Sequence, residues 1–180
     1  DKSWPLLLNV LTTNENLPSV VLRTVAADPR TGVTGLQRTI TLTNANIAVE
    51  ARILSTSKGR RMPVFGVGTG GVGGYKFQIA PAKKTAELIV GDTEPQLIAS
   101  APFSWESGAW NQCRLQIRKT GDASWRIEAK AWKVGEAEPK EWLLTADTKE
   151  APISGQPSVL GSPLAGTPIW YDDLKVQPAP

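Results

Sequence analysis

The stretch NQCRLQIRK, residues Asn111–Lys119, alternates apolar and polar side chains, and the same pattern returns in SWRIEAKAWK, residues Ser124–Lys133. Side chains of a β-strand point alternately to two faces, so this pattern predicts two strands that each have one buried and one polar face. The dipeptide Gly121-Asp122 between them is a turn signal. The two stretches are therefore predicted to form an antiparallel hairpin.

Period-two alternation dominates the rest of the chain, and convincing segments with helical periodicity are missing. Half-buried strands with a polar opposite face argue against a parallel sheet. The sequence therefore predicts an all-β protein, an antiparallel β-sandwich or barrel with many short strands. Further strands are expected at residues 20–26, 36–42, 46–54, 64–67, 74–80, 86–90, 159–161 and 169–176.

The chain has 180 residues, which is the length of one domain, or of one domain with an arm. Its 16 glycines and 14 prolines suit many turns and are too few for a collagen or a disordered chain. Residues 1–18 are expected to form a leading arm or edge strand, because Pro5 and Pro18 interrupt them. Residues 19–177 are expected to form the sandwich domain, and residues 178–180 a tail.

Two absences exclude large classes of chemistry. The chain has no histidine, which excludes Ser-His-Asp triads and histidine metal sites, and Cys113 is its single cysteine, which excludes an internal disulfide and a thiolate zinc site. Its 20 basic and 17 acidic residues are interspersed, without the basic stripe that binds nucleic acid. No apolar run is long enough to cross a membrane, so no membrane insertion is expected.

Three segments carry a family resemblance. FSWESGAWN, residues 103–111, places Gly-x-Trp before a long strand; the strand at residues 127–132 is followed by the loop GEAEP, residues 135–139, and by Trp142; and the chain closes with IWYDDLKV, residues 169–176. This order resembles the concanavalin A-like, laminin G-like (LamG) jelly-roll domains of secreted bacterial, planctomycete-type proteins. The resemblance implies the fold but not one function, because lectins, adhesion domains, glycan-binding modules and glycosidases share it.

Tryptophans are the first candidates for contact with a sugar, because an indole can stack on the apolar face of a pyranose ring. Trp132 lies in the polar register of its strand, and Trp105 lies in a turn, so both are candidate ligand-binding residues. Core packing is the expected role of Trp110, Trp125 and Trp170. Packing around Pro139 is the alternative for Trp132.

The polar faces of the middle strands carry mixed hydrogen-bond donors and acceptors that could bind vicinal hydroxyls. A solvated sheet surface is the alternative interpretation of the same residues. The candidates on these faces are Glu50, Arg52, Lys76, Gln78, Arg126, Glu128 and Lys130.

Asp172-Asp173 is the candidate metal site. The resemblance implies a structural calcium ion held by an Asp of the final strand, and Glu50 is a candidate second carboxylate. Calcium takes six to eight oxygen ligands, so the Asp pair alone is insufficient. Adjacent residues of a regular strand point to opposite faces, so at most one of Asp172 and Asp173 is expected to face a given site. No other cofactor is expected.

A glycoside hydrolase is the alternative from a different class, with Glu50 and Glu128 as the two carboxylates that such chemistry needs. The Glu-x-Asp-x-(x)-Glu signature of jelly-roll glucanases is absent, and Glu136, Glu138 and Glu141 are expected to be solvated loop acids. The glycine-rich segment 66–74 precedes another strand instead of a helix, which favours a hairpin over a nucleotide-binding loop.

The sequence thus indicates a non-catalytic carbohydrate-binding or adhesion-type module, part of a larger polypeptide that is secreted or associated with a bacterial cell envelope. Its expected partner is a glycan or another protein. The alternatives are the carbohydrate-active enzyme and a purely structural or protein-interaction domain.

Overall fold

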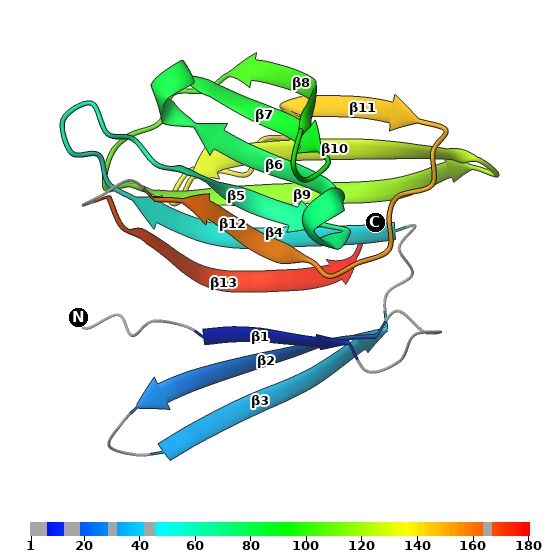
Figure 1. Ribbon diagram of the computed structural model, residues 1–180, viewed down its shortest axis with the longest axis horizontal. Helices are drawn as coiled ribbons and strands as arrows, with labels where there is room; N and C mark the ends of the chain where they lie inside the picture. Colours follow the sequence, from blue (N-terminus) through cyan, green and yellow to red (C-terminus); the bar gives the residue numbers. More distant parts are fainter. Residues whose placement is uncertain (1–6, 13–18, 29–31, 42–45, 164–166) are drawn as a thin grey trace. The chain divides into compact units, whose positions relative to one another are not determined.

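The computed structural model describes residues 7–12, 19–28, 32–41, 46–163 and 167–180, and for the first three ranges it describes the backbone alone. The chain divides into two units, residues 1–43 and residues 44–180. Figure 1 labels the strands of both units.

The first unit contains a three-stranded antiparallel sheet in the order β1-β2-β3, made of β1 (Leu7–Thr12), β2 (Ser19–Asp28) and β3 (Gly32–Thr41). The division between the units lies after residue 43, whereas the sequence places the start of the sandwich at residue 19. The two boundaries differ because β2 pairs with β1 and with β3, and neither β2 nor β3 pairs with any other described strand. Alternation identifies a strand but not the sheet that it joins.

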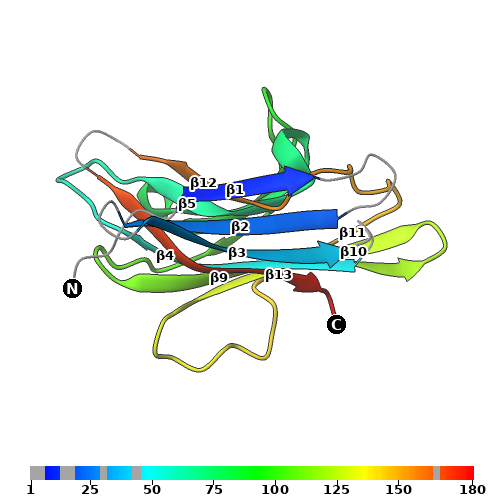
Figure 2. The ribbon, with the colours of Figure 1, turned by 90° about the horizontal axis from the view of Figure 1, so that it is seen from below.

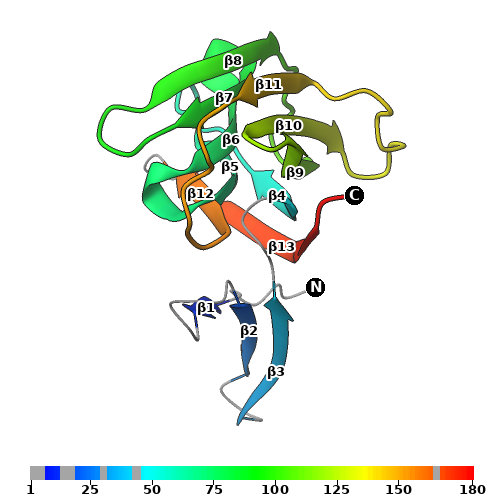
Figure 3. The same ribbon diagram turned by 90° about the vertical axis from the view of Figure 1, so that its right-hand side faces the viewer.

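The second unit consists of two five-stranded antiparallel sheets, which Figure 3 shows as two layers. We call them sheet I and sheet II. Sheet I contains, in spatial order, β11 (Leu144–Thr148), β10 (Ser124–Lys133), β9 (Trp110–Gly121), β4 (Asn46–Ser55) and β13 (Ile169–Pro178). Sheet II contains β12 (Ser158–Ser162), β5 (Val64–Thr69), β6 (Tyr75–Ala80), β7 (Thr85–Val90) and β8 (Gln96–Pro102).

The chain crosses between the two sheets repeatedly, from β4 to β5, from β8 to β9, from β11 to β12 and from β12 to β13. This interleaving is typical of a jelly-roll sandwich. The predicted fold class, an all-β antiparallel sandwich, is therefore confirmed. Residue 178, expected to begin a tail, still belongs to β13, where it pairs with Ile47. Among the described residues, no helix is long and apolar enough to cross a membrane.

The core lies between the sheets, where one face of each strand is buried. Burial of these side chains is the main stabilising contribution, at roughly 25 cal/mol per Å² of apolar surface. Cys113 lies among them, as expected. The most deeply buried residues are Val49, Ile53, Leu115, Ile117 and Ile127 of sheet I and Phe65, Val67, Phe77, Ile79 and Leu88 of sheet II.

The glycine-rich segment connects β5 to β6, which pair antiparallel, so the predicted hairpin is confirmed. A 3-10 turn at residues 71–73 lies between the two strands. Gly74 is required there because a Cβ atom at this position would lie 1.9 Å from the carbonyl oxygen of Thr69.

Candidate functional site

The outward-facing side of sheet I carries the candidate site. The strand register aligns polar and aromatic side chains in rows that cross β10, β9, β4 and β13, because residues of paired strands lie opposite one another. Both β10 and β4 neighbour β9, so the rows join residues far apart in sequence. In order along the sheet, the rows are Trp110–Leu54–Trp170, Trp132–Gln112–Arg52–Asp172, Lys130–Arg114–Glu50–Lys175 and Glu128–Gln116–Ala48–Gln177.

Lys130 lies at the centre of an aromatic cluster. Its Nζ atom lies 4.5 Å from the ring centre of Trp142 and 5.9 Å from that of Trp132. The guanidinium of Arg114 lies 5.7 Å from the ring of Trp142. Cations over the face of an indole are attracted by its quadrupole, so these contacts fix both rings.

Trp142 belongs to the segment of residues 134–143, which connects β10 to β11. Figure 2 shows this segment in yellow, projecting from sheet I on the side away from β5 and β12. Lys130 Nζ donates a 2.8 Å hydrogen bond to the carbonyl of Pro139 and lies 2.7 Å from Glu138 Oε1. The segment is therefore fastened to the outer face by its own sheet. The packing of Trp132 around Pro139 stays a prediction, since the contact recorded for its ring is the one with Lys130.

Arg52 contacts both residues of the expected calcium site. Its Nη2 atom donates a 2.6 Å hydrogen bond to Asp172 Oδ2, and its Nε atom lies 2.9 Å from Asp173 Oδ2. The prediction that at most one of these carboxylates faces a given site is wrong. A register shift between Asp172 and Lys175 inserts one extra residue, and Asp173 adopts a φ of 48°, so the regular alternation is broken.

The described residues contain no group of three or more Asp, Glu, Cys or His side chains that could hold a metal ion. The carboxylates of Asp172 and Asp173, the expected calcium ligands, both form ion pairs with the guanidinium of Arg52.

Glu128, a candidate for both binding and catalysis, is buried in a hydrogen-bond network. Arg118 donates to both of its oxygens, at 2.8 Å and 3.0 Å, and Gln116 donates at 2.7 Å. Burial alone would raise the pKa of Glu128, but the hydrogen bonds from Arg118 and Gln116 outweigh it and lower the pKa. The second carboxylate, Glu50, accepts a 2.6 Å hydrogen bond from Gln112. The carboxylates of Glu128 and Glu50 therefore both accept hydrogen bonds from side chains of the same sheet.

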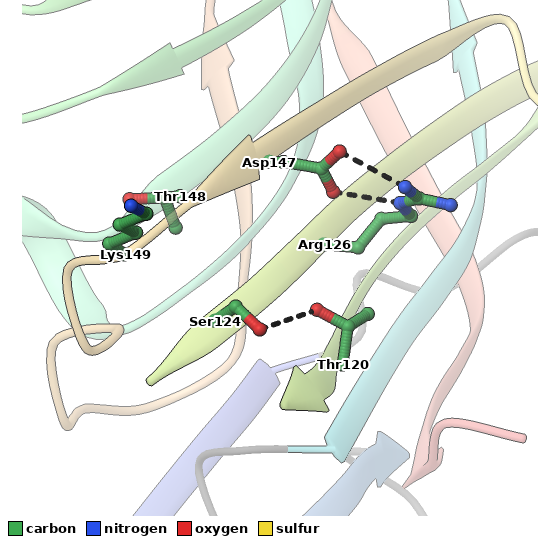
Figure 4. Close-up of a pocket in the computed structure, with 6 residues that line it drawn as sticks. All are labelled: Thr120, Ser124, Arg126, Asp147, Thr148 and Lys149. Atoms are coloured by element: carbon green, nitrogen blue, oxygen red, sulfur yellow. Dashed lines mark hydrogen bonds and ion pairs between the residues drawn. The ribbon is translucent and has the colours of Figure 1, made fainter. Parts of the chain in front are cut away.

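Arg126 lies toward the other end of β10, in an open hollow of about 360 Å³. It donates two hydrogen bonds, of 2.8 Å and 3.0 Å, to Asp147 of β11. The hydroxyls of Thr120 and Ser124 are hydrogen-bonded to each other beside this pair, as Figure 4 shows. The remaining lining residues are Thr148 and Lys149.

Three predicted ligand residues lie away from this face. Lys76 and Gln78 belong to β6 of sheet II, where Lys76 donates to the carbonyl of Gly91 and Gln78 donates to Glu87. The two polar faces look alike in sequence, and only the sheet order separates them. Trp105 packs against the core ring of Phe65, with the ring centres 6.3 Å apart.

Two of the three tryptophans expected in the core lie outside it. Trp110 lies under the guanidinium of Arg52, at 5.5 Å, and Trp170 is 37% exposed. Both share a row with Leu54 on the outer face. Trp125 does lie on the face of β10 that carries the buried Ile127. The outer face of sheet I thus has four indoles, since Trp132 and Trp142 are there as well.

Arg114 is not among the site residues that the sequence predicts. Glu138 is exposed, as predicted, and it also contacts both Lys130 and Arg114. The polar register of β9 was a signal for Arg114, since the residue alternates with Cys113 and Leu115. No pattern in the sequence indicates that residue 138 returns to the sheet.

No family model matches this chain, and no curated protein sequence matches it. Its structure is similar to that of the marine PL-14 alginate lyase from Aplysia kurodai, with a TM-score of 0.47 and 9% identity over 94% of this chain and 87% of the lyase. It is also similar to a protein of unknown function from Shewanella oneidensis MR-1, with a TM-score of 0.36 and 12% identity over 92% of this chain and 65% of that protein. Similarities this distant carry no conclusion about activity.

Proposed function

We propose that the chain is a non-catalytic carbohydrate-binding module, and that the outer face of sheet I is its binding surface. The supporting observation is the interleaving of four indoles with rows of charged and amide side chains on that face. Indoles stack on the apolar faces of sugar rings, and neighbouring polar groups hydrogen-bond the hydroxyls. Trp132 is the proposed platform, with Arg52 and Gln112 beside it in the same row.

The LamG-type resemblance of the sequence is part of the same proposal. It suggests a domain of a larger bacterial protein that is secreted or attached to the cell envelope. A glycan is the proposed partner. A structural calcium ion near Asp172 and Asp173 is the least supported element, because Arg52 already supplies a cation to both carboxylates.

The hydrolase alternative is less favoured by the geometry. A general acid needs a raised pKa, whereas that of Glu128 is lowered by its hydrogen bonds to Arg118 and Gln116. Glu50 is likewise occupied, by Gln112 at 2.6 Å. The structural or protein-interaction alternative makes no use of the indoles, so a binding experiment separates it from the proposal.

The test is affinity electrophoresis of the full chain through gels that contain one polysaccharide each, run once with calcium and once with a chelator. Retardation by one polymer, lost in Trp132→Ala and kept in Leu97→Ala, is the expected result. Leu97 is a matched control because it is an exposed apolar side chain on sheet II. No retardation in any gel would overturn the proposal in favour of the structural or protein-interaction domain. Retardation that is equal in both buffers would remove calcium from it.

A further inference from the structure

Arg114 and Lys130 are two cations side by side on the outer face of sheet I, Lys130 buried and Arg114 largely so. They lie opposite each other on β9 and β10, and their side chains are 14% and 6% exposed. Two like charges removed from water need counter-charges close by. The groups that provide them determine what else this site could bind.

One counter-charge comes from the segment of residues 134–143. Glu138 Oε1 lies 2.7 Å from Lys130 Nζ and 3.3 Å from Arg114 Nη1. The hydrogen bond from Lys130 lowers the pKa of Glu138, burial opposes the shift, and the charges of Lys130 and Arg114 strengthen it. Glu138 is therefore an ionised carboxylate. Its side chain is 45% exposed, so it contacts the cations from the solvent side.

Arg114 is incompletely satisfied. Its polar contacts are long: 3.3 Å to Glu138, 3.5 Å to the side-chain amide of Gln116 and 3.9 Å to Glu50. Its Nε atom is buried and has no hydrogen-bond partner among the described residues. A guanidinium binds a carboxylate best through two parallel hydrogen bonds, and Glu138 does not reach that geometry.

Glu138 is the carboxylate partner of Lys130, whereas Glu50 lies 3.9 Å from Arg114 and is shared with Lys175 at 4.0 Å. Displacing Glu138 leaves Lys130 without a carboxylate partner among the described residues, next to the rings of Trp132 and Trp142. That vacancy suits a single carboxylate next to an aromatic surface.

We propose that Arg114 and Lys130 form a subsite for one carboxylate group of a sugar acid, and that Glu138 fills this subsite as an internal competitor. The inference rests on the proposed carbohydrate-binding function and names the ligand class. A ligand carboxylate would take the place of that of Glu138, and Trp142 would move with its segment. No bond is made or broken in this exchange.

The test is an NMR titration of the full chain with D-glucuronate, with D-glucose as the neutral match and with acetate as the carboxylate alone, followed on the indole N–H signals. Glu138→Gln removes the competing charge and is expected to tighten glucuronate binding on the order of tenfold. Glu141→Gln, a charge loss in the same segment at an exposed residue, is expected to leave it unchanged. Arg114→Gln is expected to abolish the preference for glucuronate over glucose.

Several outcomes would overturn the subsite. Glucuronate binding that is equal or weaker in Glu138→Gln, or a gain for glucose as large as that for glucuronate, would do so while leaving the proposed function intact. Glucuronate binding no tighter than acetate would overturn the assignment to a sugar acid. If no sugar moves any indole signal in any variant, both proposals fail. Should Glu138→Gln not fold, Glu138→Asp shortens the reach of the carboxylate and is expected to show a smaller gain.

Discussion

The phenol of Tyr171 donates a 2.9 Å hydrogen bond to the backbone carbonyl of Leu160 and thereby joins sheet I to sheet II. The residue after Leu160 must be glycine for this contact, since a Cβ atom at Gly161 would lie 2.1 Å from the phenol oxygen. The bond ties β13 to β12, the outermost strand of sheet II. It therefore secures the sandwich at an edge, where strands are otherwise held from one side.

Removing this hydrogen bond should destabilise the second unit. Tyr171→Phe keeps the ring but leaves the Leu160 carbonyl without its donor, and we expect a loss of about 1 kcal/mol in the free energy of unfolding. Urea denaturation measures it. Trp170→Phe, a change at the neighbouring exposed residue, is the control and is expected to have little effect. Equal stability of Tyr171→Phe and the wild type would mean that the bond contributes nothing.

The phenols of the two tyrosines, Tyr75 and Tyr171, should ionise at a higher pH than a phenol in water. Burial raises the pKa of Tyr171 to about 12 and also raises that of Tyr75 above its usual 10.0. The fold therefore disfavours the phenolate, so this contribution to stability is complete below about pH 10 and is lost as the pH rises toward 12. At pH 10 we expect less phenolate absorbance in the folded protein than in the denatured protein, where about half of the phenols are ionised. Half ionisation at pH 10 while folded would contradict this.

The strand pattern was predictable because burial imposes it. Expected bounds and observed bounds agree at Ser124–Lys133 and differ by one or two residues at β4 and β9. β8 and β11 were missed, because neither repeats a clear apolar alternation: Leu97 and Ile98 of β8 are adjacent and both exposed. Sheet membership could not be predicted, because a strand's own side chains do not specify its neighbours.

The candidate site was predictable only in part. Trp132, Arg52 and Glu128 do lie on one face, since the same alternation that buries one side of sheet I exposes the other. The extra residue in β13 moves Lys175 to the face of Asp172, although strict alternation puts them on opposite faces. Bulges and returning loops depend on contacts between distant residues, which one sequence does not display.

Arg52 should stabilise the bulge of β13 by neutralising Asp172 and Asp173. Because all three side chains are about a third to a half exposed, we expect Arg52→Gln to cost about 1 kcal/mol or less. With the guanidinium gone, millimolar calcium should raise the melting temperature of this variant more than that of the wild type. The double variant with Asp172→Asn is the control and should lose the calcium response. A response as large in the wild type would restore calcium as a native ligand.

Glu128 should make stability depend on pH. Its pKa is below the usual 4.5, because hydrogen bonds from Arg118 and Gln116 outweigh burial. A lowered carboxyl pKa stabilises the fold above pH 4.5, and this stabilisation is lost as the pH falls through the lowered value. At pH 7 we expect Glu128→Gln to lose about 2 kcal/mol, and the gap to the wild type should shrink in acid. Glu141→Gln is the control, and its free energy of unfolding should not differ from that of the wild type in this way. A loss of stability in Glu128→Gln that stays constant from pH 7 to pH 3 would contradict the role of the lowered pKa.

Cys113 offers a probe of opening, because it is the single thiol of the chain and lies fully buried between the sheets. Burial raises the pKa of the thiol, and only the thiolate reacts with a disulfide reagent. Labelling of the folded protein should therefore be slower than that of the denatured chain by at least about a hundredfold, since it requires sheet I and sheet II to separate. The labelling rate should rise with urea in step with unfolding, and Tyr171→Phe should raise it further because one link between the sheets is gone. Rapid labelling in native buffer, with an unchanged melting temperature, would mean that Cys113 is accessible without unfolding and would contradict its place in the core.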